Sequence, residues 1–248
     1  MRIAIITDIH ENIINLKQAF NKIDKSNCDE VICLGDISGY SVPYYDYLQS
    51  RNAHECLSLV RANCRTMILG NHDLHAARII PKSKAYFDFP PNWYQLHHRE
   101  RRVLANNALW LHEENDLDPL YREEDIEFLH TLPESVHQEF SGVKVLFTHY
   151  VYPNISGLRK EFYTYSDEFR KHFEFMDALD CQVSFVGHAH VKGFTMATRK
   201  RFRQYRYRRI ELKHRPCCIG IPPVTRLNKR NGFCIFDTDA MSIKVIKL

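Results

Sequence analysis

Five short apolar segments of this chain each lead into Asp, Asn or His, and this pattern limits the folds that the chain can adopt. The segments cover residues 3–7, 31–34, 66–69, 143–147 and 183–186. They are short and rich in β-branched and aromatic residues, which predicts buried β-strands. Three of them are followed directly by glycine, which allows a tight turn. Because ligands bind outside the carboxyl ends of strands in open α/β sheets, the pattern predicts a polar site at one sheet edge.

The segments between these strands predict an α/β fold. Apolar residues recur at helical spacing over residues 13–23, and residues 56–60 also fit a helix. Alternation of strands and helices is typical of a parallel sheet. From residue 143 onward, strand-like segments separated by turn residues predict a second, more antiparallel sheet, which includes residues 218–221, 232–237 and 241–248.

Residues 75–135 interrupt the alternation of strands and helices. They contain an aromatic, proline-containing stretch at 86–98, and they predict helices near 99–111 and 122–131. Packing against the core is the favoured role of the aromatic residues, and a lid or a contact in a homo-oligomer are the alternatives. His97, His98 and His112 are expected at the surface. Residues 1–248 are predicted to form one domain with a helical and aromatic excursion at about 75–135.

The polar residues at the strand ends form a set of potential metal ligands. They are Asp8, His10, Asp36, Asn71, His149, His188 and His190. Mixed nitrogen and oxygen donors suit Mn²⁺, the favoured ion, and also Fe, Zn²⁺ or Ni²⁺, with Mg²⁺ as a further alternative. Seven donors are too many for one tetrahedral ion but serve two ions if one carboxylate bridges them. The charge of the ions would also offset the cost of burying Asp8.

Two pairs of these residues are separated by a single position. In an extended segment residues i and i+2 point the same way, so Asp8 with His10, and His188 with His190, are each expected to face one point. A single histidine at a strand end is more often a hydrogen-bonded structural residue than a ligand. The coincidence of five such strand ends favours the metal site over this alternative.

The motifs that these residues form resemble those of the calcineurin-like metallophosphoesterase superfamily. They occur in the order DIH (8–10), GD (35–36), GNHD (70–73), a lone His149 and GHAH (187–190). Through DIHEN, GDISGY and GNHD the likeness is greatest to the small prokaryotic phosphodiesterase-type branch. The resemblance implies an α/β fold built as a four-layer αββα sandwich of two mixed sheets flanked by helices, with two divalent metal ions as cofactors.

The resemblance also implies roles for individual residues. The ligands would divide around a bridging residue: Asp8, His10 and His190 for one ion, Asn71, His149 and His188 for the other, and Asp36 between them. A water that bridges the ions would attack phosphorus in line. His72 and Asp36 are the implied catalytic residues, and His72 would stabilise charge or protonate the leaving oxygen beside the phosphate. Asn12, Asn71 and His72 are implied to contact substrate.

The chain departs from the family pattern at two positions. Glu11 stands where DxHGN has glycine; it could narrow access to one ion or contact a cationic substrate group, but an outward-facing side chain is favoured. Gly39 stands where the protein serine/threonine phosphatase branch has an acidic residue that orients its catalytic histidine. His72 is therefore expected to lack that orienting partner, which argues against a protein phosphatase.

The basic charge of the chain is concentrated in one segment. Residues 199–215 contain nine Lys or Arg and one Glu, whereas the whole chain has a net charge of +4. Arginine alternates with tyrosine along a predicted strand, a pattern that single-stranded nucleic acid or nucleotide sites use for charge and stacking. Arg203 and Arg206 are therefore predicted to contact an anionic substrate. A solvated hairpin whose arginines block edge-to-edge pairing is the alternative.

Other features indicate a cytoplasmic protein. No apolar run approaches the roughly 18 residues that a membrane span needs, so no membrane contact is expected. The predicted first strand begins at once, which leaves no room for a signal peptide. The eight cysteines form no CxxC pair, which favours free thiols in a reducing compartment.

These features together favour a cytoplasmic, dinuclear-metal phosphohydrolase that acts as a phosphodiesterase on a phosphate-ester substrate. A phosphomonoesterase or protein phosphatase and a dinucleoside polyphosphate hydrolase are alternatives, because such enzymes share ligands and differ in the shape of the cleft. A catalytically inactive scaffold of the same fold is the alternative from another class. Such a scaffold tends to lose ligands, whereas this chain has all seven and His72.

Overall fold

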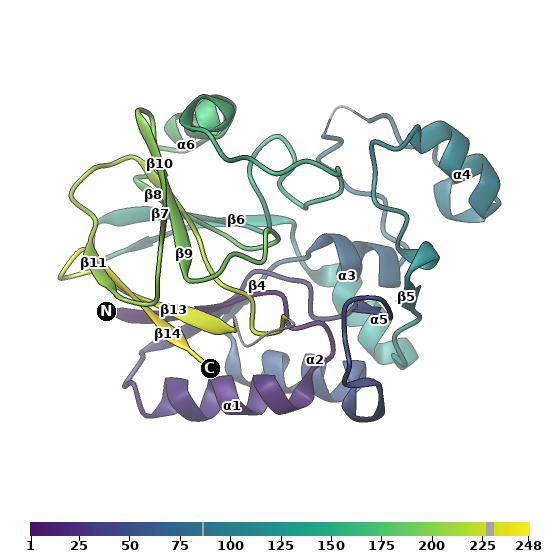
Figure 1. Cartoon of the computed structure of the whole chain (residues 1–248), viewed down its shortest axis with the longest axis horizontal. Helices are drawn as coiled ribbons and strands as arrows, with labels where there is room; N and C mark the ends of the chain where they lie inside the picture. The colour runs from purple at the N-terminus through teal and green to yellow at the C-terminus, as the bar shows by residue number, and fades with distance from the viewer. Residues whose placement is uncertain (86, 227–230) are drawn as a thin grey trace.

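The structure, a computed structural model, describes residues 1–85, 87–226 and 231–248. Its centre is a pair of six-stranded sheets (Figure 1). The first sheet has the strand order β11-β14-β13-β1-β2-β4. Its strands span Arg209–Glu211 (β11), Ser242–Lys247 (β14), Gly232–Asp237 (β13), Arg2–Ile6 (β1), Glu30–Cys33 (β2) and Thr66–Met67 (β4). Within it, β1, β2 and β4 are parallel neighbours, and the remaining pairs are antiparallel.

The second sheet has the strand order β10-β9-β12-β8-β7-β6. Its strands span Arg201–Tyr205 (β10), Phe194–Thr198 (β9), Cys217–Gly220 (β12), Val183–Val186 (β8), Val143–Thr148 (β7) and Ser135–Phe140 (β6). Here β7, β8 and β12 are parallel neighbours, and the remaining pairs are antiparallel. Both sheets are therefore mixed, as expected.

Three apolar clusters show how the layers are stacked. Helices α1 (Ile13–Asp24) and α2 (Ala53–Asn63) pack on the outer face of the first sheet, where Leu16 and Val60 meet Ala4 and Ile6 of β1. Residues of both sheets, such as Ile5 and Phe185, form the cluster between them. Helix α6 (Arg170–Ala178) covers the outer face of the second sheet. The order of layers is helix, sheet, sheet, helix, so the predicted αββα sandwich is confirmed.

The segment that connects β4 of the first sheet to β6 of the second lies to one side of the two sheets (Figure 1). It contains α3 (Asn71–Ala76), α4 (His98–Ala105), β5 (Asp116–Leu117), α5 (Glu123–Thr131) and the short 3₁₀ helices Trp93–Gln95 and His112–Glu114. The helix predicted near 99–111 ends earlier, because Asn106 and Asn107 adopt left-handed conformations. Trp93 packs with Phe87, Phe89 and Leu109 in a small cluster of its own. Residue 86 of the aromatic stretch lies outside the described residues.

Two expectations about the C-terminal strands are wrong. Strands β13 and β14 do not join the second sheet; β13 pairs with β1 in the first one, from Arg2 opposite Asp237 to Ile5 opposite Cys234. The basic segment is not one strand, since β10 lies in the second sheet and β11 in the first. Both errors concern the choice of a distant partner strand, which a local pattern does not encode.

Two further expectations concern cysteines and membranes. All eight cysteines are free thiols, as expected, and seven of them are buried. Among the helices of the described residues, none is long and apolar enough to cross a membrane.

A buried histidine between α6 and the second sheet should make stability depend on pH. His172 of α6 is fully buried; its Nδ1 accepts from the Tyr152 backbone N–H, and its Nε2 donates to Ser184 Oγ at 3.0 Å. Burial lowers its pKa to about 3, whereas an unfolded histidine titrates near 6.5. Below pH 6.5 the unfolded chain therefore binds a proton at His172 that the folded chain does not bind. The free energy of unfolding decreases as the pH falls from about 6.5 towards 3.

We expect His172→Asn to flatten this part of the pH dependence. Between pH 7.5 and 5, the wild type should lose about 2 kcal/mol more unfolding free energy than the variant. Urea unfolding at both pH values, followed by circular dichroism, measures the difference. His137→Asn, which changes an exposed histidine of β6, should behave like the wild type. Identical pH dependence in His172→Asn and the wild type would contradict the expectation.

Candidate metal centre

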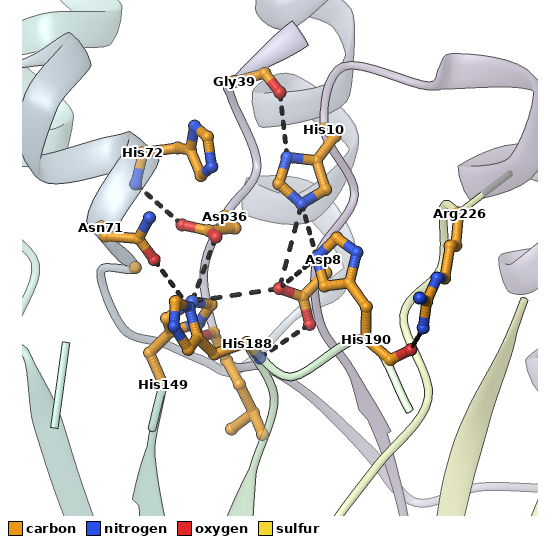
Figure 2. Close-up of polar contacts among 12 residues, drawn as sticks. Asp8, His10, Asp36, Gly39, Asn71, His72, His149, His188, His190 and Arg226 are labelled. Atoms are coloured by element: carbon orange, nitrogen blue, oxygen red, sulfur yellow. Dashed lines mark hydrogen bonds and ion pairs between the residues drawn. The ribbon is translucent and has the colours of Figure 1, made fainter. Parts of the chain in front are cut away.

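The loops that follow the strands bring the predicted ligands together at the carboxyl ends of both parallel triplets (Figure 2). Five of these residues have left-handed backbone conformations: Asp8 (φ 53°), His10 (φ 50°), Asp36 (φ 53°), His188 (φ 61°) and His190 (φ 45°). Non-glycine residues in this region cost roughly 1–3 kcal/mol each and concentrate at functional sites. The strand ends are therefore tight turns and not extended segments.

These turns change which side chains meet. Asp8 and His10 still face a common point, as expected, but His188 and His190 do not. His190 lies beside His10, with 3.0 Å between the two Nε2 atoms, whereas His188 Nδ1 lies 3.0 Å from Asn71 Oδ1. The expectation that His188 and His190 face one point fails because it assumed an extended backbone, in which alternate side chains share a face.

The first group of potential ligands consists of Asp8, His10 and His190. Asp8 Oδ1 lies 3.2 Å from His190 Nε2 and 3.9 Å from His10 Nε2. His10 donates its Nδ1 proton to the Gly39 carbonyl at 2.9 Å, so its Nε2 carries a lone pair that faces the group. Two ligands about 2.1 Å from one ion, at tetrahedral or right angles, lie about 3.0–3.4 Å apart.

The second group consists of Asp36, Asn71, His149 and His188. His149 donates Nδ1–H to the Leu34 carbonyl at 2.7 Å, and its Nε2 lies 3.1 Å from Asp36 Oδ2. The two groups adjoin each other, because His149 Nε2 is also 3.9 Å from Asp8 Oδ1. Asp36 offers an oxygen both to a group with His149 and His188 and to one with His10.

The buried polar atoms of the centre fit bound cations. Asp8 Oδ1, His149 Nε2 and His188 Nε2 are buried and have no hydrogen-bond partner in the part of the chain that the structure describes, although an unpaired buried polar group is costly. Once His149 releases its proton all three atoms are acceptors, and imidazole and carboxylate ligands together suit divalent cations. The donor set therefore fits the metal ions that the family resemblance implies.

The electrostatics of the group also favour a positive charge. Burial alone would lower the pKa of His149, but the neighbouring Asp36 carboxylate raises it, so a proton remains on the imidazole. Burial lowers the pKa of His10 and of His188 well below the usual range, so both rings are neutral and offer lone pairs. Burial likewise lowers the pKa of His72 to about 3 in the absence of a bound anion.

The glycines and the last acid of the motifs hold the loops in place. A Cβ atom at Gly70 would lie 2.1 Å from Asp36 Oδ1, so only glycine lets the third strand end pass so close to the second. Asp73 does not contact the His72 ring: its Oδ1 accepts hydrogen bonds from Ser38 Oγ and from the backbone N–H groups of Ile37 and Ser38. Asp36 Oδ1 in turn accepts from the His72 N–H at 2.9 Å.

Glu11 does not face outward, so the favoured expectation is wrong. Its side chain is 1% exposed. It accepts hydrogen bonds from the Gly39 and Tyr40 backbone N–H groups and lies 3.5 Å from an Arg51 guanidinium nitrogen. Glu11 therefore stabilises the loop after Asp36 by hydrogen bonds. This loop contains the Gly39 carbonyl, to which His10 donates.

The excursion contributes two residues that the motifs do not reveal. His112, expected at the surface, is 7% exposed, and its Nε2 accepts from Asn71 Nδ2 at 3.1 Å. This bond turns the Asn71 oxygen towards His188. Asp116 Oδ2 lies 2.6 Å from His72 Nδ1, so His72 has the acidic neighbour that Gly39 does not provide. His97 is exposed and His98 half-buried.

The remaining residues implied or predicted to bind substrate belong to neither ligand group. The Asn12 side chain accepts from the Asn15 N–H and caps α1. Arg203 and Arg206 are exposed, while Tyr205 between them stacks on Phe194 of the sheet core. Arg226, which no motif indicated, donates to the His190 carbonyl at the edge of the centre (Figure 2).

Comparison with known proteins agrees with this geometry. The model of the calcineurin-like phosphoesterase family matches residues 1–192. An uncharacterized protein of Methanocaldococcus jannaschii is 27% identical over 252 residues, which cover 99% of this chain and 86% of that protein.

Two solved structures share the fold. A metallophosphoesterase from Sphaerobacter thermophilus has a TM-score of 0.66 at 20% identity, and the match covers 100% of this chain and 88% of that one. A hypothetical protein from Pyrococcus horikoshii has a TM-score of 0.62 at 15% identity, with 100% and 87% covered. The chain therefore belongs to the calcineurin-like phosphoesterases, a family of metal-dependent phosphoric ester hydrolases.

Proposed function

We propose that this protein is a phosphodiesterase that depends on two divalent cations, with Mn²⁺ the favoured ion. Asp8, His10 and His190 would hold one ion and Asn71, His149 and His188 the other, with Asp36 shared between them. The observation that carries the proposal is the adjacency of the two ligand groups, which contain three buried ligand atoms without a hydrogen-bond partner among the described residues. Such atoms are rare in folded proteins unless a ligand satisfies them.

When bound, the cations would supply a nucleophilic water at neutral pH and neutralise charge on the phosphate. The chain's own residues would do the rest. His72 belongs to a group with His10 and Asp36, so its ring borders the space where the phosphate would bind. Its backbone N–H also holds Asp36 in place. A hydrogen bond from His72 to the phosphate or to the leaving oxygen would stabilise the transition state.

We expect purified protein with added Mn²⁺ to hydrolyse bis-p-nitrophenyl phosphate faster than p-nitrophenyl phosphate. Chelator treatment should abolish turnover, and readdition of Mn²⁺ should restore it, because the cations would supply the nucleophile and neutralise charge on the phosphate. The same assay with Ni²⁺ and Mg²⁺, and with mononucleotides, dinucleoside polyphosphates and short RNA, narrows the metal and the substrate. A role of Arg203 and Arg206 in nucleotide binding stays a prediction.

Two outcomes would contradict the proposal. Faster hydrolysis of the monoester would favour a phosphomonoesterase on the same ligand set. No turnover of any ester by a protein shown to contain two metal ions would favour an inactive scaffold. Metal content measured by elemental analysis on the same preparation separates these outcomes from a simple failure to load metal.

A further inference from the structure

The acidic residue nearest to His72 comes from the excursion and not from the family motifs. Asp116 Oδ2 lies 2.6 Å from His72 Nδ1, and the side chain of Asp116 is 8% exposed. Among the described residues neither atom has a partner with hydrogen-bond geometry, so the two are in close contact without a formal hydrogen bond between them. A buried carboxylate oxygen and a buried imidazole nitrogen so close together are stable only if a positive charge or a shared proton lies between them.

The fold holds Asp116 firmly at this point. Strand β5 pairs with β3 (Tyr40–Ser41), with Ser41 opposite Asp116, so the backbone of Asp116 is tied to the loop that follows Asp36. The imidazole of His112 packs against that of His72, with ring centroids 4.0 Å apart and the rings tilted by 37°. Because His112 Nε2 accepts from Asn71, its proton is on Nδ1, which lies 3.6 Å from the same Asp116 oxygen.

Gly39 explains why the acid comes from elsewhere. A Cβ atom at Gly39 would lie 2.2 Å from His72 Nδ1, and Gly39 has a φ of 98°, which strains any other residue. An acidic side chain at position 39 would therefore displace the ring it should orient. The β3–β5 pairing brings Asp116 to the same nitrogen from a segment 77 residues further along the chain.

We propose that Asp116 is a positioning residue for His72. Its carboxylate lies against Nδ1 and fixes the plane of the ring, so that Nε2 is turned towards the substrate. The inference rests on the proposed phosphodiesterase function, in which His72 acts next to the phosphate. The excursion at about 75–135 would then contribute to catalysis, because β5 supplies a residue that the strand-end motifs do not.

The test is a double-mutant cycle between Asp116→Asn and His72→Ala, with kcat and KM measured on bis-p-nitrophenyl phosphate. In the wild-type background Asp116→Asn should lower kcat about 10- to 100-fold, the usual cost of losing a residue that orients a functional side chain. In the His72→Ala background the same change should cost less than about twofold, because its target is gone. KM should change little in either background.

Asp118→Asn is the matched control, since it removes the same charge from an exposed residue two positions along. Metal content and melting temperature are measured for every variant. Equal losses in both backgrounds, or a variant that does not fold, would make Asp116 a structural residue and overturn the inference. Loss of one metal ion in Asp116→Asn would also overturn it, because His72, His112 and Asp116 would then be ligands of a further cation.

Failure of the inference is distinguishable from failure of the proposed function. A wild-type protein that hydrolyses no ester contradicts the proposed function before any variant is made. An active wild type in which Asp116→Asn behaves like Asp118→Asn contradicts the inference alone.

Discussion

Replacing Asp36 by asparagine is expected to release both metal ions and to reduce turnover to background. Its Oδ2 lies 3.1 Å from His149 Nε2, while its Oδ1 accepts the His72 N–H, so both oxygens are in use at the junction of the ligand groups. The asparagine amide has only one oxygen, carries no charge, and replaces the second oxygen with an NH₂ group that cannot bind a cation. Because the metal ions supply several kcal/mol of transition-state stabilisation, kcat/KM should fall at least about 10³-fold.

Elemental analysis of the purified variant measures the metal content, and the diester assay measures turnover. Asp46→Asn is the control, since it changes an exposed acid in the loop that follows Asp36 and should keep both metal ions and full activity. An Asp36→Asn protein that binds two metal ions would show that Asp36 does not bridge them. Unchanged activity would refute its assignment altogether.

The second large effect is expected for His72→Ala, which should lower kcat and keep the metal ions. The ring of His72 borders both ligand groups but belongs to neither ligand set, and the backbone N–H that holds Asp36 remains in alanine. Loss of a general acid or of a hydrogen bond to the transition state costs about 10²–10⁴ in rate. If His72 protonates the leaving oxygen, phenyl diesters should lose more activity than p-nitrophenyl diesters.

The measurements are kcat for a series of aryl diesters and metal content by elemental analysis. His130→Ala, an exposed histidine of α5, controls for the loss of an imidazole and should match the wild type. Full activity of His72→Ala would remove His72 from the reaction. Loss of metal together with activity would instead mean that His72 is a ligand or supports one.

Local patterns predicted the elements that bury one face. Leu16, Ala19, Phe20 and Ile23 face the first sheet in α1, and helical spacing of apolar residues was enough to find it. The strand ends with Asp8, Asp36 and Asn71 were found for the same reason, since a buried run followed by a polar residue is visible in the sequence. The sequence does not show which strands pair, and the expectation for β13 was therefore wrong: it pairs with β1.

The residues missed at the site have one feature in common. His112 and Asp116 lie in the segment without strand–helix alternation, and neither belongs to a motif. Nothing in the sequence distinguishes Asp116 from other acidic loop residues such as Asp118; the β3–β5 pairing is what places it beside His72. Glu11 was misjudged for a related reason, because its partners Gly39 and Arg51 are distant in sequence.

The sequence by itself determined the kinds of ligand, the strands that carry them and the layered α/β fold, because burial and strand-end chemistry are properties of short segments. Only the tertiary structure decided that β13 and β14 complete the first sheet, that Glu11 is buried against the loop after Asp36, and that Asp116 meets His72. These outcomes depend on left-handed turns and on pairing between distant segments, whose free energy comes from packing and not from local preference.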